Sequence, residues 1–330
     1  MYVIYLFLTE SSNAIIDTVI KMKIKKVGIL GAGAVGSYMI WGLSQKKDIE
    51  LYVIADGKRA KRLESGILIN DEMYHPNVVS SCKLDLLIVC LKYGALKDAL
   101  DTISDCVSQH TIVMSLMNGV DSEEIIGEKI GISHMLYSLI KVASHKEQDG
   151  FYFDPETTIG IVYGGKEEYV LAIDELFENT PLHYRKTDCI LEEIWSKFRL
   201  NVCNNLPQAI LGAGVGCYRD SKHMQAIRQG LQSELEAIAK AKGIDLNKAA
   251  TSSFHGSIVP PKARYSTLQD LDAKRHTEID MFSGALMRMG KELGIPTPYN
   301  EYTYHMIKAL EEKNDGLFEY DNVDEKTSAS

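Results

Sequence analysis

Three glycines near the start of the chain have a spacing that suits the binding of a dinucleotide. Gly31, Gly33 and Gly36 form G-x-G-x-x-G after an apolar run that predicts a strand and before a pattern that predicts a helix. In such a turn the first glycine allows the bend, the second admits a pyrophosphate, and the third lets the helix pack closely. The free N–H groups of the helix N-terminus would then face the phosphates. The expected cofactor contacts are Gly31, Ala32, Gly33, Ala34, Val35 and Gly36, and the alternative is a glycine turn with a packing role only.

Two polar residues stand at the ends of predicted buried strands. Lys92 ends the apolar run Asp85–Lys92, and Asn118 ends the run Thr111–Gly119. Ligands of open α/β sheets bind just outside the carboxyl ends of the strands. There, Lys92 can contact a phosphate or ribose, and the Asn118 amide can bind the nicotinamide region. The alternatives are a surface lysine lying along apolar neighbours and a simple Asn-Gly turn.

The residues after the predicted second strand, Ile49–Asp56, bear on the choice between NAD and NADP. Asp56 lies about 20 residues beyond the last glycine, where an acidic side chain binds the ribose 2′-hydroxyl of NAD. A cationic cluster follows at once and could hold the 2′-phosphate of NADP, or be a solvated helix face. It consists of Lys58, Arg59, Lys61 and Arg62. The local pattern leaves the cofactor open.

A second polar group lies on one predicted helix, Leu191–Gly212. Lys197, Asn201 and Asn205 are four residues apart, which puts them on one face of an α-helix. An apolar stripe runs beside them, formed by Phe198, Val202, Leu206 and Ile210. Polar groups beside a core are costly to bury without partners, and a polar substrate could supply those partners. The alternative is a surface pair of Lys197 with Glu193, and asparagines bonded to each other or to water.

The alternation of strands and helices predicts an α/β domain over residues 23–187, followed by a helical domain over residues 188–316. In the first domain we expect short strands over residues 66–81, and Asp121 capping a helix with Glu124 completing a capping box. Further strands are expected near His134–Ala143, Thr157–Tyr163 and His183–Tyr184, with a helix near Tyr169–Glu178.

In the second domain, Pro207 predicts a kink, and the glycine cluster Gly212–Gly216 follows a helix, so we expect an interhelical loop there. Ser266 is expected to cap a helix that begins near Thr267. The segment Arg275–Glu278 is expected to open a longer helix that continues to Leu293. The remaining helices are expected at about Ser221–Lys242, Lys248–Ser257 and Asn300–Glu312.

Composition limits the class of protein. The 330 residues carry 36 Lys and Arg against 45 Asp and Glu, a formal charge of −9, which argues against nucleic acid or an anionic membrane as the main partner. Six scattered cysteines without a C-x-x-C pair indicate reduced thiols and a cytoplasmic protein. The pattern predicts no metal site, nucleophile elbow or Walker A loop.

Both ends of the chain stand apart from this pattern. The apolar run Met1–Leu8 is too short to span a bilayer and lacks the positive flank of a signal peptide. We interpret residues 1–22 as an N-terminal extension. Our hypothesis is that it results from a mis-assigned start codon. Residues 317–330 are expected to form a flexible acidic tail.

Together these motifs resemble the ketopantoate reductase (2-dehydropantoate 2-reductase) family over about residues 23–312. Besides GAGAVG, LK at Lys92 and MNG at Asn118, two specific segments carry the resemblance: LEEIWSKFRLNVCNN and YSTLQDLDAKRHTEID. The resemblance implies an α/β, N-terminal Rossmann-type doubly wound domain plus an all-helical C-terminal domain. It also implies NADPH-dependent reduction of a small-molecule 2-keto acid, 2-dehydropantoate, to D-pantoate on the route to pantothenate and coenzyme A.

The resemblance further implies a role for each residue. Lys197 would be the general acid that gives a proton to the keto oxygen as hydride reaches its carbon. Glu278 would bind the substrate hydroxyl, set the electrostatic field around Lys197 and contact the cofactor. Asn201 and Asn205 would bind substrate oxygens, and Ser266 would hold the substrate carboxylate. Asn118 would lie between nicotinamide and substrate, and Lys92 near the cofactor ribose and phosphate.

Three positions depart from the family pattern. Asp56 stands where an arginine usually pairs with the 2′-phosphate, Ala95 replaces a glutamine, and Ser283 replaces an asparagine. The first leaves NAD beside NADP, and the other two suggest altered substrate contacts. One alternative is therefore a D-2-hydroxyacid dehydrogenase that acts on branched 2-keto acids, with NAD. A non-catalytic dinucleotide-sensing protein is another alternative, and a homodimer is compatible with each.

Overall fold

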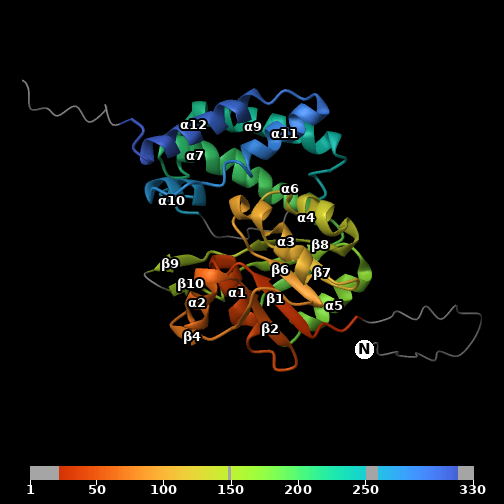
Figure 1. Cartoon of the computed structure of the whole chain (residues 1–330). Coiled ribbons are helices and arrows are strands. Elements are labelled where there is room, and N and C mark those ends of the chain that lie inside the picture. Colours follow the sequence, from red (N-terminus) through yellow and green to blue (C-terminus); the bar gives the residue numbers. More distant parts are fainter. Residues whose placement is uncertain (1–21, 148–149, 250–258, 319–330) are drawn as a thin grey trace, which may run out of the picture. The chain divides into compact units, whose positions relative to one another are not determined.

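The computed structural model describes residues 22–147, 150–249 and 259–318, and the chain divides into two compact units between Leu191 and Glu192. The first unit is an α/β domain (Figure 1). Within the described residues the second unit consists of helices and their connections. No helix in the described part of the chain is long and apolar enough to cross a membrane. The expected extension, residues 1–22, lies outside the described residues except for Met22, and the expected tail, residues 317–330, does so except for Leu317 and Phe318.

The first unit is built on an eight-stranded sheet with the order β12-β11-β8-β7-β6-β1-β2-β5. Its neighbouring strands are parallel except for β8 and β11, which are antiparallel. From β1 the chain builds outward to one side and then returns to β6 on the other, so the strand order reverses between β1 and β6. Such a reversal marks the ligand site of doubly wound sheets, and the predicted Rossmann-type fold is confirmed. The strands are β1 (Lys26–Leu30), β2 (Glu50–Ile54), β5 (Asn77–Val79), β6 (Leu86–Val89), β7 (Ile112–Ser115), β8 (Met135–Lys141), β11 (Gly160–Gly164) and β12 (Tyr184–Lys186).

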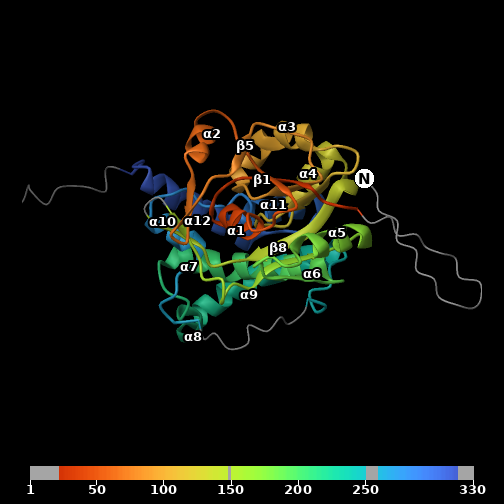
Figure 2. The ribbon, with the colours of Figure 1, turned by 90° about the horizontal axis from the view of Figure 1, so that it is seen from below.

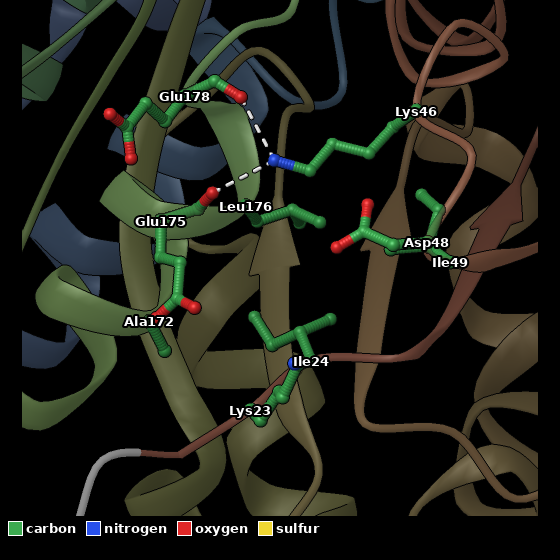
Figure 3. A pocket seen from close by; sticks show the side chains of 9 residues that line it. All are labelled: Lys23, Ile24, Lys46, Asp48, Ile49, Ala172, Glu175, Leu176 and Glu178. Carbon is green, nitrogen blue, oxygen red and sulfur yellow. Dashed lines mark hydrogen bonds between the residues drawn. The ribbon is translucent and has the colours of Figure 1, made fainter.

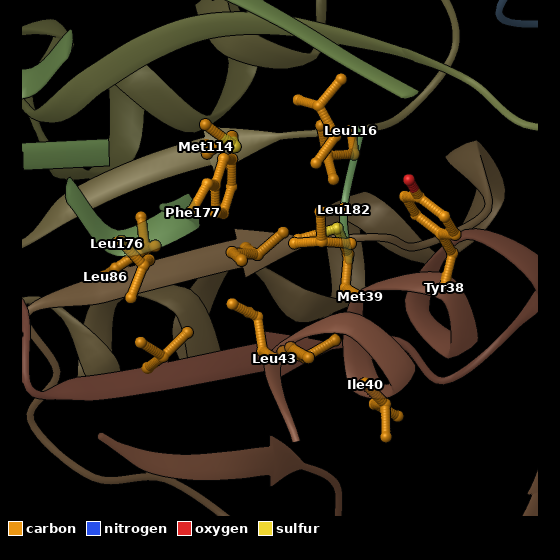
Figure 4. Close-up of a cluster of buried hydrophobic side chains, with 14 of the residues drawn as sticks. Tyr38, Met39, Ile40, Leu43, Leu86, Met114, Leu116, Leu176, Phe177 and Leu182 are labelled. Atoms are coloured by element: carbon orange, nitrogen blue, oxygen red, sulfur yellow. The ribbon is translucent and has the colours of Figure 1, made fainter. Parts of the chain in front are cut away.

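Helices cover both faces of this sheet (Figure 2). Side chains alternate along β6: Leu86 and Ile88 pack in the cluster of α1 and α5, whereas Leu87 and Val89 pack in the cluster of α3 and α4. Figure 4 shows part of the first cluster. Burial on both faces explains why the strands are continuous apolar runs. The helices are α1 (Ala34–Leu43), α2 (Gly57–Glu64), α3 (Leu96–Cys106), α4 (Ser122–Ile130) and α5 (Glu167–Phe177).

A smaller sheet has the order β4-β3-β10-β9. Its strands are β3 (Ile67–Ile69), β4 (Glu72–Tyr74), β9 (His145–Glu147) and β10 (Gly150–Tyr152). The first two fall in the region where short strands were predicted, but β9 and β10 were not predicted. Strands of three residues are too short to show an alternation of apolar and polar positions.

The second unit packs its helices around side chains such as Phe198, Leu235 and Ile307, all of them buried. Helices α9, α11 and α12 contact one another. The elements are α6 (Ile190–Leu200), the π-helical turn η3 (Asn201–Asn205), α7 (Leu206–Leu211), α8 (Cys217–Asp220), α9 (Lys222–Ala241), α10 (Ser266–Asp272), α11 (Ser283–Leu293) and α12 (Pro298–Asn314). The helix predicted over Lys248–Ser257 lies almost wholly outside the described residues.

The helix predicted over Leu191–Gly212 is interrupted next to Pro207, where the π-helical turn η3 directly precedes α7. Pro207 lies in the first turn of α7. One other helix prediction in this unit was wrong. Helix α11 begins at Ser283, so Arg275–Glu278 does not open it. That segment instead forms a connection that begins after Lys274, whose φ of 51° belongs to the left-handed region.

Candidate cofactor and substrate sites

Two of the three glycines in the turn between β1 and α1 are required by the fold itself. Gly31 has a φ of 103°, and a Cβ there would lie 2.6 Å from the carbonyl oxygen of Cys90 at the end of β6. A Cβ on Gly36 would collide with the carbonyl oxygen of Gly31. The first glycine therefore makes the bend and the third lets α1 approach it, as the sequence pattern predicts.

Gly33 differs from its two neighbours in the pattern. It is exposed, and a Cβ placed on it would meet no described atom within 4 Å. No internal packing therefore explains a glycine here, whereas a closely approaching phosphate group would. The turn thus has the room that a dinucleotide pyrophosphate needs.

The N-terminus of α1 also suits an anion. Gly33 is its N-cap residue, and the amide of Ser37 donates the first intrahelical hydrogen bond to the Gly33 carbonyl, at 2.8 Å. The N–H groups of Ala34, Val35 and Gly36 precede that bond and have no partner within the helix. The first turn carries no acidic side chain, so the positive end of the helix dipole is not neutralised.

The adenosine end of the cofactor would meet residues of both charges. Asp56 is exposed two residues after the end of β2, at the N-cap position of α2, and its carboxylate makes no capping hydrogen bond. Lys58 and Arg59 are exposed in the first turn of the same helix. A ribose hydroxyl and a 2′-phosphate could each find a partner here, so the geometry leaves both cofactors open.

The loops that carry Lys92 and Asn118 are tied to each other. Lys92 is exposed just after β6, and Asn118 is half-buried after β7. The hydroxyl of Tyr93 donates a hydrogen bond of 2.7 Å to Asp121 Oδ2. The predicted capping box is therefore wrong: Asp121 occupies the N-cap position of α4, but its carboxylate accepts from Tyr93 instead of capping the helix. Sequence reasoning did not find Tyr93, because the contact joins two different loops.

A buried carboxyl group lies at the start of α4, the helix that follows the Asn118 loop. Glu123, in the first turn of α4, is 4% exposed, and Ser122 Oγ donates to its Oε2 at 2.7 Å. Ser122 Oγ also lies 2.8 Å from Ser115 Oγ at the end of β7. Burial raises the pKa of Glu123 to about 7, although the hydrogen bond from Ser122 acts in the opposite direction. Nothing in the sequence pattern distinguished Glu123 from the exposed Glu124 beside it.

One hollow in the first unit lies elsewhere. It measures about 220 Å³ and is lined by residues that precede β1 and β2, such as Ile24 and Ile49. Lys46 Nζ donates to the carbonyl oxygens of Glu175 and Glu178, at 3.0 and 2.9 Å, where α5 ends (Figure 3). A lysine at this position satisfies the last carbonyls of a helix and suits its dipole. Lys46 therefore has a structural role in this hollow. The hollow lies at the amino ends of the strands, away from the residues predicted to bind cofactor or substrate.

In the second unit, two predicted substrate residues meet. Asn205 is 3% exposed, and its Nδ2 donates to the exposed Ser266 Oγ at 3.1 Å. The expectation that Ser266 caps a helix was wrong. Ser266 is the first residue of α10, and its hydroxyl oxygen accepts the hydrogen bond from Asn205. Within the described residues, Asn205 Oδ1 is a buried acceptor without a hydrogen-bond partner, which is a costly arrangement unless a donor completes it.

Lys197 and Asn201, the other two polar residues predicted on the helix that carries Asn205, are half-buried. Lys197 lies in the last turn of α6, and Asn201 opens the π-helical turn. The prediction of one regular α-helical face was wrong beyond Asn201, because a π-helical turn takes up more residues than an α-helical turn. Glu193, the partner in the alternative surface pair, is only 3% exposed and so is not a surface residue.

The second glycine cluster is an interhelical loop, as predicted, and it supports the segment before Ser266. A Cβ on Gly214 would collide with the carbonyl oxygen of Pro261. Gln208, on α7 and fully buried, donates through Nε2 to the Ala263 carbonyl at 2.8 Å and accepts from the Tyr265 amide at 2.9 Å. These bonds fix the backbone on the N-terminal side of Ser266, a role that sequence reasoning missed.

Glu278 is half-buried in the connection between α10 and α11. Ser283, one of the three departures from the family pattern, is fully buried, and its hydroxyl donates to Asn300 Oδ1 at 3.0 Å. This serine therefore joins α11 to α12 inside the unit. Among the described residues, no group of three or more His, Cys, Asp or Glu side chains could hold a metal ion.

Comparison with known proteins identifies both units. The ketopantoate reductase PanE/ApbA family matches residues 27–160, and the PanE/ApbA C-terminal family matches residues 189–311. The 2-dehydropantoate 2-reductase of Pyrococcus horikoshii is 27% identical over 303 residues, which cover 88% of this chain and 99% of that protein.

Two solved structures have a similar fold. D-mandelate dehydrogenase with NADH and anilino(oxo)acetate has a TM-score of 0.74 at 21% identity, over 88% of this chain and 99% of that one. A dimeric ketopantoate reductase from Staphylococcus aureus has a TM-score of 0.70 at 16% identity, over the same shares. At these identities the structures establish the likeness of the fold alone.

Proposed function

The chain belongs to the ketopantoate reductase family of pyridine-nucleotide-dependent oxidoreductases, and on this premise we propose that it reduces 2-dehydropantoate to D-pantoate with NADPH. The reaction would belong to pantothenate and coenzyme A biosynthesis. Residues 23–187 would bind the dinucleotide, and residues 188–316 would bind the substrate. The observation that carries the proposal is the hydrogen bond between Asn205 and Ser266, because it joins the two segments that are most specific to the family.

The first unit would hold the cofactor. The open space at Gly33 and the helix N-terminus at Ala34 suit the pyrophosphate, and Lys92 stands at the adjoining strand end. When bound, the nicotinamide supplies the hydride that reduces the keto carbon. Asn118 would hydrogen-bond in the nicotinamide region.

The second unit would supply the proton and the substrate contacts. Lys197 would donate a proton from Nζ to the keto oxygen, and its positive charge would stabilise the developing alkoxide. Glu278 would accept a hydrogen bond from the substrate hydroxyl, while Asn201 binds a substrate oxygen. Ser266 Oγ accepts from Asn205 Nδ2, so its own hydrogen is available to an anionic acceptor. This polarity supports Ser266 as the contact for the substrate carboxylate.

A second function has specific support. Asp56, two residues after the end of β2, suits the 2′-hydroxyl of NAD, and D-mandelate dehydrogenase, whose structure contains NADH, shares the fold. A D-2-hydroxyacid dehydrogenase acting on branched 2-keto acids is therefore the alternative. A cytoplasmic homodimer is our proposal for the assembly, because the Staphylococcus aureus ketopantoate reductase is dimeric. Light scattering of the purified protein tests the dimer.

Incubation of the purified full chain with ketopantoate and NADPH tests the proposed reaction. We expect oxidation of NADPH in step with the formation of pantoate, and chiral chromatography should identify the product as the D form. Tight NADPH binding without turnover of either ketopantoate or 2-ketoisovalerate would instead indicate a dinucleotide-sensing protein.

A further inference from the structure

A buried carboxylate on the last helix holds the residue next to Glu278. Glu311, on α12, is 2% exposed. Its Oε1 accepts two hydrogen bonds from Thr277, one from the backbone N–H at 2.7 Å and one from the hydroxyl at 2.6 Å. A charged group is stable in a buried position only when it is paired and hydrogen-bonded. These two bonds therefore fix Thr277 to α12.

The other oxygen of Glu311 is also occupied. Lys308 Nζ donates to Oε2 at 2.8 Å, and His276 Nδ1 lies 3.7 Å from the same oxygen. Each oxygen of the carboxylate thus has defined neighbours, which leaves the side chain little freedom to rotate. The partners on either side make Glu311 a fixed anchor for the connection between α10 and α11.

The connection is anchored on the far side of Glu278 as well. Ile279 and Phe282 are almost fully buried. The carbonyl oxygen of Glu278 accepts from the amides of Met281 at 3.0 Å and Phe282 at 3.2 Å. Glu278 therefore lies between one residue fixed by Glu311 and others fixed by the core of the unit, although it belongs to no regular helix.

We propose that Glu311 is a positioning residue for Glu278, acting through Thr277 to fix the backbone from which the Glu278 carboxylate binds the hydroxyl of the 2-keto acid. This inference rests on the proposed function of Glu278. Glu311 itself touches neither substrate nor cofactor in this role. A purely structural role would stabilise the unit without depending on Glu278, so coupling between the two residues separates the roles.

The first test uses substitutions that keep the shape of the contact. Thr277→Val removes the hydroxyl donor but keeps the N–H, and Thr277→Ser keeps both donors. Loss of a hydrogen bond to a charged group should lower kcat/KM for ketopantoate roughly 10-fold in Thr277→Val, mainly through KM. Thr277→Ser should restore the wild-type value, and the Kd for NADPH should stay unchanged in both. Equal activity of Thr277→Val and wild type would overturn the proposal.

The second test is a double-mutant cycle with Glu311→Gln, Glu278→Ala and the double variant. If Glu311 acts through Glu278, Glu311→Gln should lower kcat/KM in the wild type and have little further effect beside Glu278→Ala. Full additivity would overturn the proposal. An unchanged kcat/KM in Glu278→Ala alone would instead refute the proposed function of Glu278. Glu312→Gln, at the exposed neighbouring position, is the matched control. If Glu311→Gln does not fold, the same cycle with Thr277→Val decides.

Discussion

The side-chain amide of Asn205 donates a hydrogen bond of 3.1 Å to the hydroxyl of Ser266, which lies 61 residues further along the chain. The bond joins the π-helical turn η3 to the first residue of α10. It gives the serine a fixed acceptor role toward Asn205 and leaves its hydrogen for another acceptor. The pair therefore has the polarity that a carboxylate-binding hydroxyl requires.

Ser266→Ala should weaken the binding of the 2-keto acid. Removing one hydrogen bond to a carboxylate should raise KM for ketopantoate roughly 10-fold, while the Kd for NADPH stays the same. Steady-state kinetics and cofactor titration measure the two quantities. Ser233→Ala is the control, because that exposed hydroxyl only donates to the Gln229 carbonyl of its own helix. An effect confined to NADPH binding would contradict the assignment.

Lys197→Ala should impair the chemical step. If Lys197 is the general acid, kcat should fall by about 10²–10⁴ with little change in the melting temperature. Lys222→Ala, at an exposed position on α9, should leave kcat unchanged. A Lys197→Ala enzyme that retains the wild-type kcat would exclude Lys197 from proton donation.

Gly33→Ala and Gly36→Ala should separate cofactor binding from folding. A Cβ at Gly33 meets only open space, so this variant should keep its melting temperature and lose NADPH affinity. A Cβ at Gly36 collides with the Gly31 carbonyl, so that variant should lose stability as well. Thermal unfolding without ligand and NADPH titration distinguish the two effects. Unchanged NADPH affinity in Gly33→Ala would move the pyrophosphate away from this turn.

Glu123 should make the stability of the protein depend on pH. Its folded-state pKa of about 7 lies above the ordinary value of 4.5, so the folded protein keeps a proton that the unfolded chain has released. The free energy of unfolding should therefore fall, through this group, as pH rises from about 4.5 to about 7. The glutamine in Glu123→Gln stays neutral. The free energy of unfolding of this variant should therefore rise relative to that of the wild type by on the order of 1–3 kcal/mol across this range.

Urea unfolding at several pH values measures this gain. Glu124→Gln, on the exposed position beside it, should leave the pH dependence as in the wild type. Curves for Glu123→Gln and wild type that run parallel across the range would show that the carboxyl does not titrate there.

The sequence predicts what local periodicity and glycine spacing determine. The strand–turn–helix around Gly31 and the buried strands ending before Lys92 and Asn118 follow from continuous apolar runs and the constraints on the turn. The prediction of secondary structure fails where a contact with a residue far away in the sequence determines the backbone conformation. Arg275–Glu278 has a helical pattern, but the connection around Thr277 is anchored by Glu311 on another helix.

The polar positions show the same limit. Spacing alone predicts Lys197, Asn201 and Asn205 on one α-helical face, whereas the π-helical turn alters the register within it. Gln208 and Tyr93 support Ser266 and the Asn118 loop through contacts between elements. Such contacts join residues that the sequence separates by tens of positions, and no local pattern encodes them.

The most direct test of the central claim compares kcat/KM for ketopantoate and for 2-ketoisovalerate, each with NADPH and with NADH. We predict the highest value for ketopantoate with NADPH. A higher value for 2-ketoisovalerate with NADH would contradict the claim and establish the D-2-hydroxyacid dehydrogenase instead.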